Sequence, residues 1–218
     1  MLMYKSRKTM SPQQACLYVF NEFAIAKGVG KKTLAVLLKY LYPQKILRVK
    51  TCKSGKPFIV DEDGCASHLY VSISHSNSTL VILLANIECG VDIEFMRYPE
   101  KMLSVYAWVT HPEDRVENLT AKEFLRSWTL KEAWLKLKSF GLEFGLDNIR
   151  VEGLNRFYEQ QAIEINKELL HAQFFSVAHS DQTCVLSEEP LTLRKIAMTV
   201  DTQTGLAMPK LSDKESEP

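Results

Sequence analysis

Apolar residues recur at helical spacing between residues 120 and 141. Thr120 and Glu123 form a capping-box pattern, which predicts where a helix begins, and Gly141 predicts where it ends. At about 100° per residue, one face of this helix is apolar around a single carboxylate, Glu132. The apolar members of that face are Ala121, Phe124, Leu125, Trp128 and Leu135, and a second apolar side holds Leu130, Trp134 and Leu137. We therefore expect the helix to be packed between two bodies.

Glu132 is the unusual residue of this helix, because an unpaired buried carboxylate is strongly destabilising. Lys131 and Lys136 flank it on opposite edges of the face. A salt bridge to Lys136, four residues further on, is one interpretation, since such pairs are common on helices. Binding of a ligand or a metal ion is the other. The helical pattern alone leaves both open.

Upstream, the pattern predicts two helices followed by short strands. Ser11, Pro12 and Gln14 predict the start of a first helix that ends at Gly28 and Gly30, and a second helix covers about residues 31–41. Strands are expected at residues 46–49, 58–60, 69–74 and 79–86, the last two joined as a hairpin.

Residues 90–94 alternate as a strand, which places Asp92 and Glu94 on one face. Two neighbouring carboxylates repel each other unless a cation lies between them. The alternative is the polar outer face of an edge strand.

An internal repeat sets the expected architecture. Residues 71–83 align without gaps on residues 175–187, and Ser72, His75 and Ser76 recur as Ser176, His179 and Ser180. We predict an α+β protein of two similar α/β halves in a pseudo-twofold arrangement, with mainly antiparallel sheets and a long helix packed in each half. The halves would be residues 1–95 and 96–200, in a monomer. Further strands are expected at residues 149–151, 162–165, 173–178 and 183–186, and residues 202–218 as a disordered tail.

Composition indicates a protein with an ordinary core: 218 residues, of which 46% are hydrophobic and 24% charged. The most apolar run, residues 80–87, is too short to span a bilayer. The five cysteines are scattered, which favours free thiols over a zinc site. We therefore expect a cytoplasmic protein without membrane association.

Charge is uneven along the chain, although the net charge is only +1. The segment from Lys27 to Lys56 has nine basic residues and no acidic one. This pattern is typical of a polyanion-binding surface or of a solvated basic face. Nucleic acid is not the expected partner, because the chain as a whole is not basic and carries no recognised nucleic-acid-binding motif.

Four motifs occur in an order that resembles the surfactin-type 4'-phosphopantetheinyl transferases. This family attaches the phosphopantetheine arm of coenzyme A to carrier proteins. Ser72 stands where the family usually has Asn, and the family's N-terminal arginine has no clear counterpart, so Lys31, Lys32 or Lys39 would substitute. The motifs are Gly55-Lys56-Pro57, Ser72-Ile73-Ser74-His75-Ser76, Gly90-Val91-Asp92-Ile93-Glu94 and Trp128-x-x-Lys131-Glu132-x-x-x-Lys136.

The resemblance implies a site with distinct roles for these motifs. Asp92, Glu94 and Glu132 would hold Mg²⁺, or Mn²⁺, and Glu132, Lys136 and Asp92 would carry the catalysis. Glu132 is the implied acceptor of the carrier serine's proton. Coenzyme A would be bound by Lys32, Arg48, Lys56, Pro57, Ser72, Ser74, His75, Lys131 and Lys136. The expected partners are coenzyme A and an acyl or peptidyl carrier protein. A non-catalytic module that binds coenzyme A or a carrier protein is the rival hypothesis, and it predicts an incomplete set of metal carboxylates.

Overall fold

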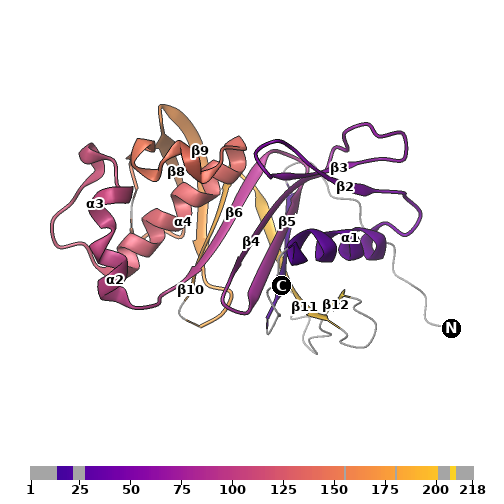
Figure 1. Ribbon diagram of the computed structural model, residues 1–218, viewed down its shortest axis with the longest axis horizontal. Helices are drawn as coiled ribbons and strands as arrows, with labels where there is room; N and C mark the ends of the chain where they lie inside the picture. Colours follow the sequence, from indigo (N-terminus) through magenta and orange to yellow (C-terminus); the bar gives the residue numbers. More distant parts are fainter. Residues whose placement is uncertain (1–13, 22–27, 155, 180, 201–206, 210–218) are drawn as a thin grey trace.

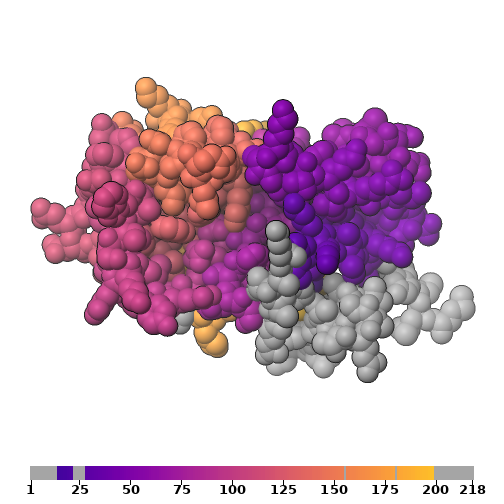
Figure 2. Space-filling view, viewed as in Figure 1, coloured from indigo at the N-terminus to yellow at the C-terminus, as the bar shows by residue number. Residues whose placement is uncertain are grey.

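The computed structural model describes residues 14–21, 28–154, 156–179, 181–200 and 207–209. Its strands form two five-stranded sheets and one two-stranded sheet, and most pairs are antiparallel. This confirms the predicted α+β class. Figure 2 shows the first half of the chain, in indigo and violet, beside the second half, in magenta and orange. None of the described helices is long and apolar enough to cross a membrane.

The first sheet has the strand order β12-β11-β1-β5-β4. Helix α1 (Val29–Leu41) packs on one face of it through Leu34, Leu37 and Leu38. Its bounds are close to those predicted for the second helix, residues 31–41. A two-stranded sheet of β2 (Arg48–Thr51) and β3 (Pro57–Val60) lies beside α1 in Figure 1. The strands of the first sheet are β1 (Gln14–Phe20), β4 (Tyr70–Ser76), β5 (Thr79–Ala85), β11 (Thr192–Val200) and β12 (Ala207–Pro209).

The predicted first helix is wrong for residues 14–20, which form β1. This strand is parallel to β11 and antiparallel to β5, and it is apolar on both faces. Tyr18 and Phe20 pack toward α1, whereas Leu17 and Val19 face the second sheet. A strand buried on both faces reads as a continuous apolar run, which periodicity does not distinguish from a buried helix. Ser11 and Pro12 lie outside the described residues.

The second sheet has the order β6-β10-β9-β8-β7, and helix α4 (Ala121–Lys138) packs on one face of it. Between β6 and α4 the chain forms α2 (Pro99–Ser104), α3 (Tyr106–Val109) and the 3₁₀ turn η1 (Pro112–Asp114). Two further 3₁₀ turns follow α4, η2 (Leu142–Phe144) and η3 (Leu146–Asn148). The strands of this sheet are β6 (Cys89–Phe95), β7 (Val151–Glu152), β8 (Gln160–Ile165), β9 (Glu168–Phe175) and β10 (Asp181–Ser187).

The two sheets pack against each other, so the order from right to left in Figure 1 is α1, first sheet, second sheet, α4. Val91, Ile93 and Val185 of the second sheet meet the first sheet in this central layer. Each half repeats one sequence of elements: a strand, a long helix and a hairpin, β1-α1-β4-β5 and β6-α4-β9-β10. Strand β6 lies in the second sheet, and β11, near the end of the chain, returns to the first sheet.

Helix α4 begins as predicted but ends earlier. The Thr120 side chain accepts from the Glu123 backbone and Glu123 reaches back to the Thr120 backbone, so the capping box is complete. The last helical residue is Lys138, and the C-cap is Ser139, which has a left-handed backbone with φ 60°; the helix therefore does not extend to Gly141. Residues 202–218 were expected to form a disordered tail, but residues 207–209 form β12, which pairs with β11. The other residues of this range lie outside the described part of the chain.

Candidate active site

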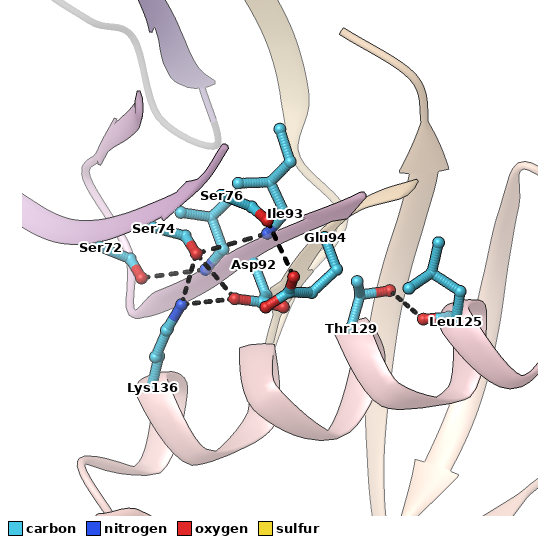
Figure 3. Close-up of polar contacts among 10 residues, drawn as sticks. Ser72, Ser74, Ser76, Asp92, Ile93, Glu94, Leu125, Thr129 and Lys136 are labelled. Carbon is cyan, nitrogen blue, oxygen red and sulfur yellow. Dashed lines mark hydrogen bonds and ion pairs between the residues drawn. The ribbon is translucent and has the colours of Figure 1, made fainter. Parts of the chain in front are cut away.

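The two sheets meet where the edge strand β4 lies beside the edge strand β6. Serine side chains join them in place of a backbone ladder: the Val91 N–H donates to Ser72 Oγ at 2.9 Å and the Ile93 N–H to Ser74 Oγ at 3.4 Å. Ser76 Oγ continues the row and donates to Glu94 Oε2 at 2.9 Å. Alternation along β4 points these three hydroxyls the same way, and Figure 3 shows them in a row facing β6.

Asp92 is the centre of a buried polar cluster below this row. Its Oδ1 accepts from Ser74 Oγ at 2.7 Å and from Lys136 Nζ at 2.6 Å, and Lys136 Nζ also donates to Ser74 Oγ at 2.8 Å. Figure 3 shows Lys136 reaching up from α4 to both residues. Asp92 is only 3% exposed, and its Oδ2 is buried without a hydrogen-bond partner among the described residues. One carboxylate oxygen is therefore left for a ligand.

Gly90 explains how β6 and α4 come close enough to form the cluster. A Cβ at this position would lie 2.0 Å from the Ala133 carbonyl oxygen and 2.8 Å from the Leu137 nitrogen, both in the backbone of α4. Only glycine permits this approach. The glycine of the Gly-x-Asp-x-Glu motif thus sets the distance between Asp92 on the strand and the side chains of the helix.

Glu132 and Glu94 complete the acidic side of the cluster. Burial, and then the neighbouring charge of Asp92, raises the pKa of Glu132 to about 7, and the ammonium of Lys136 opposes this rise. Burial and Asp92 also raise the pKa of Glu94, against the hydrogen bond from Ser76. Of the two interpretations of Glu132, the salt bridge to Lys136 is not found among the described residues, where Lys136 pairs with Asp92. Glu132 is thus a carboxylate able to take up a proton near neutral pH.

The donor set suits a hard cation, which takes carboxylate oxygens. Asp92 Oδ2 is a buried oxygen without a hydrogen-bond partner among the described residues, and the charge of Glu94 lies near enough to contribute to the raised pKa of Glu132. In the described part of the chain, however, no three His, Cys, Asp or Glu side chains converge closely enough to hold a metal ion. The oxygen chemistry therefore fits Mg²⁺, but the carboxylates are not gathered around a common centre in this arrangement.

Lys56 approaches the cluster from the Gly55-Lys56-Pro57 turn but contacts the helix end. Its Nζ donates to the Leu137 carbonyl at 2.9 Å, where a cation is favoured by the helix dipole. Burial lowers the pKa of Lys56, which the charge of Glu88 partly offsets. Pro57, the next residue, begins β3.

Lys131 lies away from the cluster. Its Nζ donates to the carbonyls of Val109 at 3.1 Å and Leu146 at 3.0 Å, so it ties α3 and η3 to α4. Burial lowers its pKa to about 8, against the opposing charges of Asp114 and Asp147. The structure does not bring this lysine to the other predicted coenzyme ligands.

A cavity of about 570 Å³ reaches the cluster at Glu94. His75, which is exposed, and Glu94 line one wall, and α2 lines another through Lys101, Met102 and Val105. Trp128 of α4 also lines it and meets the Phe124 ring edge-on, with centroids 5.8 Å apart. Sequence reasoning missed this wall, because nothing in the α2 sequence marks it as part of a site.

Two predicted coenzyme ligands lie on more distant elements. Lys32 is exposed on α1 and Arg48 is exposed at the start of β2. Neither lines the cavity. Ser76, in contrast, was not among the predicted site residues, although it belongs to one of the four motifs. Its hydrogen bond to Glu94 makes it a member of the cluster. The alternation of Ser72, Ser74 and Ser76 was the signal that could have identified it.

The chain is similar in sequence to known proteins over the region that carries this site. The model of the 4'-phosphopantetheinyl transferase superfamily matches residues 88–192, from the start of β6 to the start of β11. The chain is 26% identical over 157 residues to a protein of Haemophilus influenzae named as a 4'-phosphopantetheinyl transferase, covering 65% of this chain and 54% of that protein. It is also 26% identical over 149 residues to the 4'-phosphopantetheinyl transferase gsp of Aneurinibacillus migulanus, covering 61% of this chain and 58% of that protein.

The chain thus spans little more than half the length of these two relatives. The matched region contains Gly90, Asp92, Glu94, Glu132 and Lys136, which are the residues that the structure gathers where β6 meets α4. In the order of its motifs and in the matches over this region, the chain is similar to the 4'-phosphopantetheinyl transferase superfamily.

Proposed function

We propose that this chain transfers the 4'-phosphopantetheine group of coenzyme A to a serine of an apo carrier protein, with Mg²⁺ or, as an alternative, Mn²⁺. The products are holo carrier protein, of acyl or peptidyl type, and adenosine 3',5'-bisphosphate. The observation that carries the proposal is the buried Asp92, whose Oδ1 contacts Lys136 Nζ at 2.6 Å while Oδ2 has no partner among the described residues. We expect a monomer that acts in the cytoplasm, without nucleic acid or membrane.

The coenzyme would bind across the cluster and the adjoining cavity. Lys136 and His75 are placed to contact its pyrophosphate, with Ser74 as a hydroxyl donor. Lys56 reaches the same region from the Gly55-Lys56-Pro57 turn, next to the end of α4. Lys32 and Arg48 would act at longer range, as part of the basic segment, unless the coenzyme extends over α1. Ser72 supports the site indirectly by holding the Val91 N–H.

In the transfer step, the serine oxygen of the carrier attacks the β-phosphorus of coenzyme A. The bond from that phosphorus to the oxygen bridging the two phosphates breaks, and adenosine 3',5'-bisphosphate leaves with the bridging oxygen. Glu132 takes the serine proton, directly or through a water molecule. Lys136 and Lys56 offset the negative charge that gathers on the leaving group. A bound Mg²⁺, held by Asp92, Glu94 and Glu132, would supply further charge neutralisation.

Intact-protein mass spectrometry tests this proposal. The protein is incubated with coenzyme A, Mg²⁺ and a panel of apo acyl and peptidyl carrier proteins, together with a carrier whose modified serine is replaced by alanine. We expect at least one carrier to gain one phosphopantetheine group, and the alanine carrier and the Glu132→Gln enzyme to give none. A second transferase of known activity shows that the panel can be modified. Binding of coenzyme A without transfer to any carrier would favour the non-catalytic module instead.

A further inference from the structure

The site of the free protein already contains a cation, the ammonium group of Lys136. It lies 2.6 Å from Asp92 Oδ1, and the two side chains are 28% and 4% exposed. The same ammonium donates to Ser74 Oγ at 2.8 Å, so two contacts hold it in place. Asp92 Oδ1 is thereby shared between the Ser74 hydroxyl and Lys136.

This arrangement opposes the binding of a metal ion by itself. A divalent cation on Asp92 would lie close to the Lys136 ammonium, and two cations on one buried carboxylate repel each other strongly. The absence of any converging metal-ligand trio among the described residues agrees with this. The carboxylate best suited to a metal is neutralised by the lysine instead.

Lys136 can leave this position without unfolding its surroundings. The side chain is partly exposed, and a lysine head group moves on a flexible four-carbon stem. A pyrophosphate entering from the neighbouring cavity would offer it an anionic partner. The departure of Lys136 would then leave both oxygens of Asp92 accessible to a cation.

We propose that Lys136 is the resident counter-ion of Asp92 in the free protein, and that coenzyme A draws it away and so allows the divalent cation to bind. This inference rests on the proposed function for the identity of the coenzyme and the metal. It adds an order to their binding: the metal binds the free protein weakly, and the metal and coenzyme A strengthen each other's binding. Thermodynamic linkage requires that strengthening to be reciprocal.

Direct measurement of Mn²⁺ binding tests the proposal, with the free ion quantified by electron paramagnetic resonance. The variants are Lys136→Met, which removes the charge but keeps the length, and the matched control Lys138→Met. Lys138 is on the same helix but pairs with Glu168 and Glu188, away from Asp92. Without coenzyme A, we expect Lys136→Met to bind Mn²⁺ about tenfold or more tightly than the wild type, and Lys138→Met to match the wild type.

Coenzyme A supplies the second arm of the experiment. It should tighten Mn²⁺ binding to the wild type by about tenfold or more, and tighten it much less in Lys136→Met. Unchanged or weaker Mn²⁺ binding by Lys136→Met in the absence of coenzyme would overturn the proposal. Because that variant leaves Asp92 buried without its counter-ion, Lys136→Gln, which keeps a hydrogen-bond donor, serves if Lys136→Met does not fold. Wild-type protein that binds Mn²⁺ equally well with and without coenzyme A would also overturn it.

The two proposals fail separately. Mn²⁺ binding to the free protein needs no transfer, so an inactive protein with the expected tightening in Lys136→Met would retain the counter-ion and lose the transferase function. Conversely, if the wild type modifies a carrier but Lys136→Met binds Mn²⁺ no better than the wild type, the transferase function is retained and the counter-ion proposal is lost.

Discussion

Replacing Glu132 by glutamine should make the protein more stable at alkaline pH while removing the proposed transferase activity. The pKa of Glu132 lies at about 7 in the folded protein, against an ordinary value of 4.5, because of burial and then the charge of Asp92. The folded protein therefore holds this proton more tightly than the unfolded chain does. The free energy of unfolding must then fall as the pH rises from 4.5 through about 7.

The size of this effect follows from the difference between the two pKa values. A difference of one in pKa corresponds to about 1.4 kcal/mol, so the ionised Glu132 would destabilise the fold by about 3 kcal/mol if fully shielded from water. The side chain is partly exposed, and solvent screening reduces the expected effect to about 1 to 2 kcal/mol. Glutamine has a similar volume and no charge. Glu132→Gln should therefore have a free energy of unfolding higher than that of the wild type by about 1 to 2 kcal/mol above about pH 7, and almost the same free energy of unfolding as the wild type below pH 4.5.

Urea denaturation at several pH values checks this prediction. The wild type, Glu132→Gln and the control Glu117→Gln, an exposed residue of the loop before α4, are unfolded between pH 4.5 and pH 8.5. We expect the stability curve of Glu132→Gln to separate from the other two only as the pH rises. A constant difference between Glu132→Gln and the wild type across this range would refute the reasoning, because the effect would then not come from ionisation.

Three further changes test the packing and the partition of roles. Gly90→Ala should lower the free energy of unfolding by about 3 kcal/mol or more, since its Cβ would collide with the α4 backbone. In the control Gly141→Ala, the new Cβ meets only the movable Glu143 side chain, and urea denaturation compares the two variants. Lys131→Met should lower stability and increase hydrogen exchange at α3, since it removes the bonds to Val109 and Leu146, while Lys122→Met, an exposed lysine of α4, should do neither. His75→Ala should weaken coenzyme A binding by about 1 to 3 kcal/mol in titration calorimetry and His179→Ala should not, so equal losses would contradict a site on the first hairpin alone.

The sequence predicted the parts of this site that depend on local patterns. The capping box located the start of α4, and alternation along β6 placed Asp92 and Glu94 together on one face, opposite Val91 and Ile93. The sequence did not predict the hydrogen-bond partners of the Lys131 ammonium. These partners are two carbonyls from segments outside α4, and the resemblance had implied a coenzyme contact instead. Likewise, Lys136 pairs with Asp92 and not with Glu132 because β6 crosses α4 at Gly90, a contact between segments far apart in the chain.

The topology explains why a repeated motif gives one cluster and not two. In the first sheet β4 is the last strand, so Ser72 and Ser74 are free to receive the backbone of β6. The equivalent strand of the second sheet, β9, is paired on both sides, by β10 and β8. Ser176, the counterpart of Ser72, bonds instead to Asp181 within its own hairpin.

His179 accordingly lines a separate cavity of about 960 Å³, with Asn21 and Ser176, and does not reach the carboxylates of β6. The edge position of β4, more than the identity of the residues on it, therefore decides which of the two Ser-x-x-His-Ser segments can take part in chemistry. A strand inserted beside β4 would remove the site even with every motif intact. For the same reason, residues that cover the edge of β4 in a variant should abolish coenzyme binding without altering Asp92, Glu132 or Lys136.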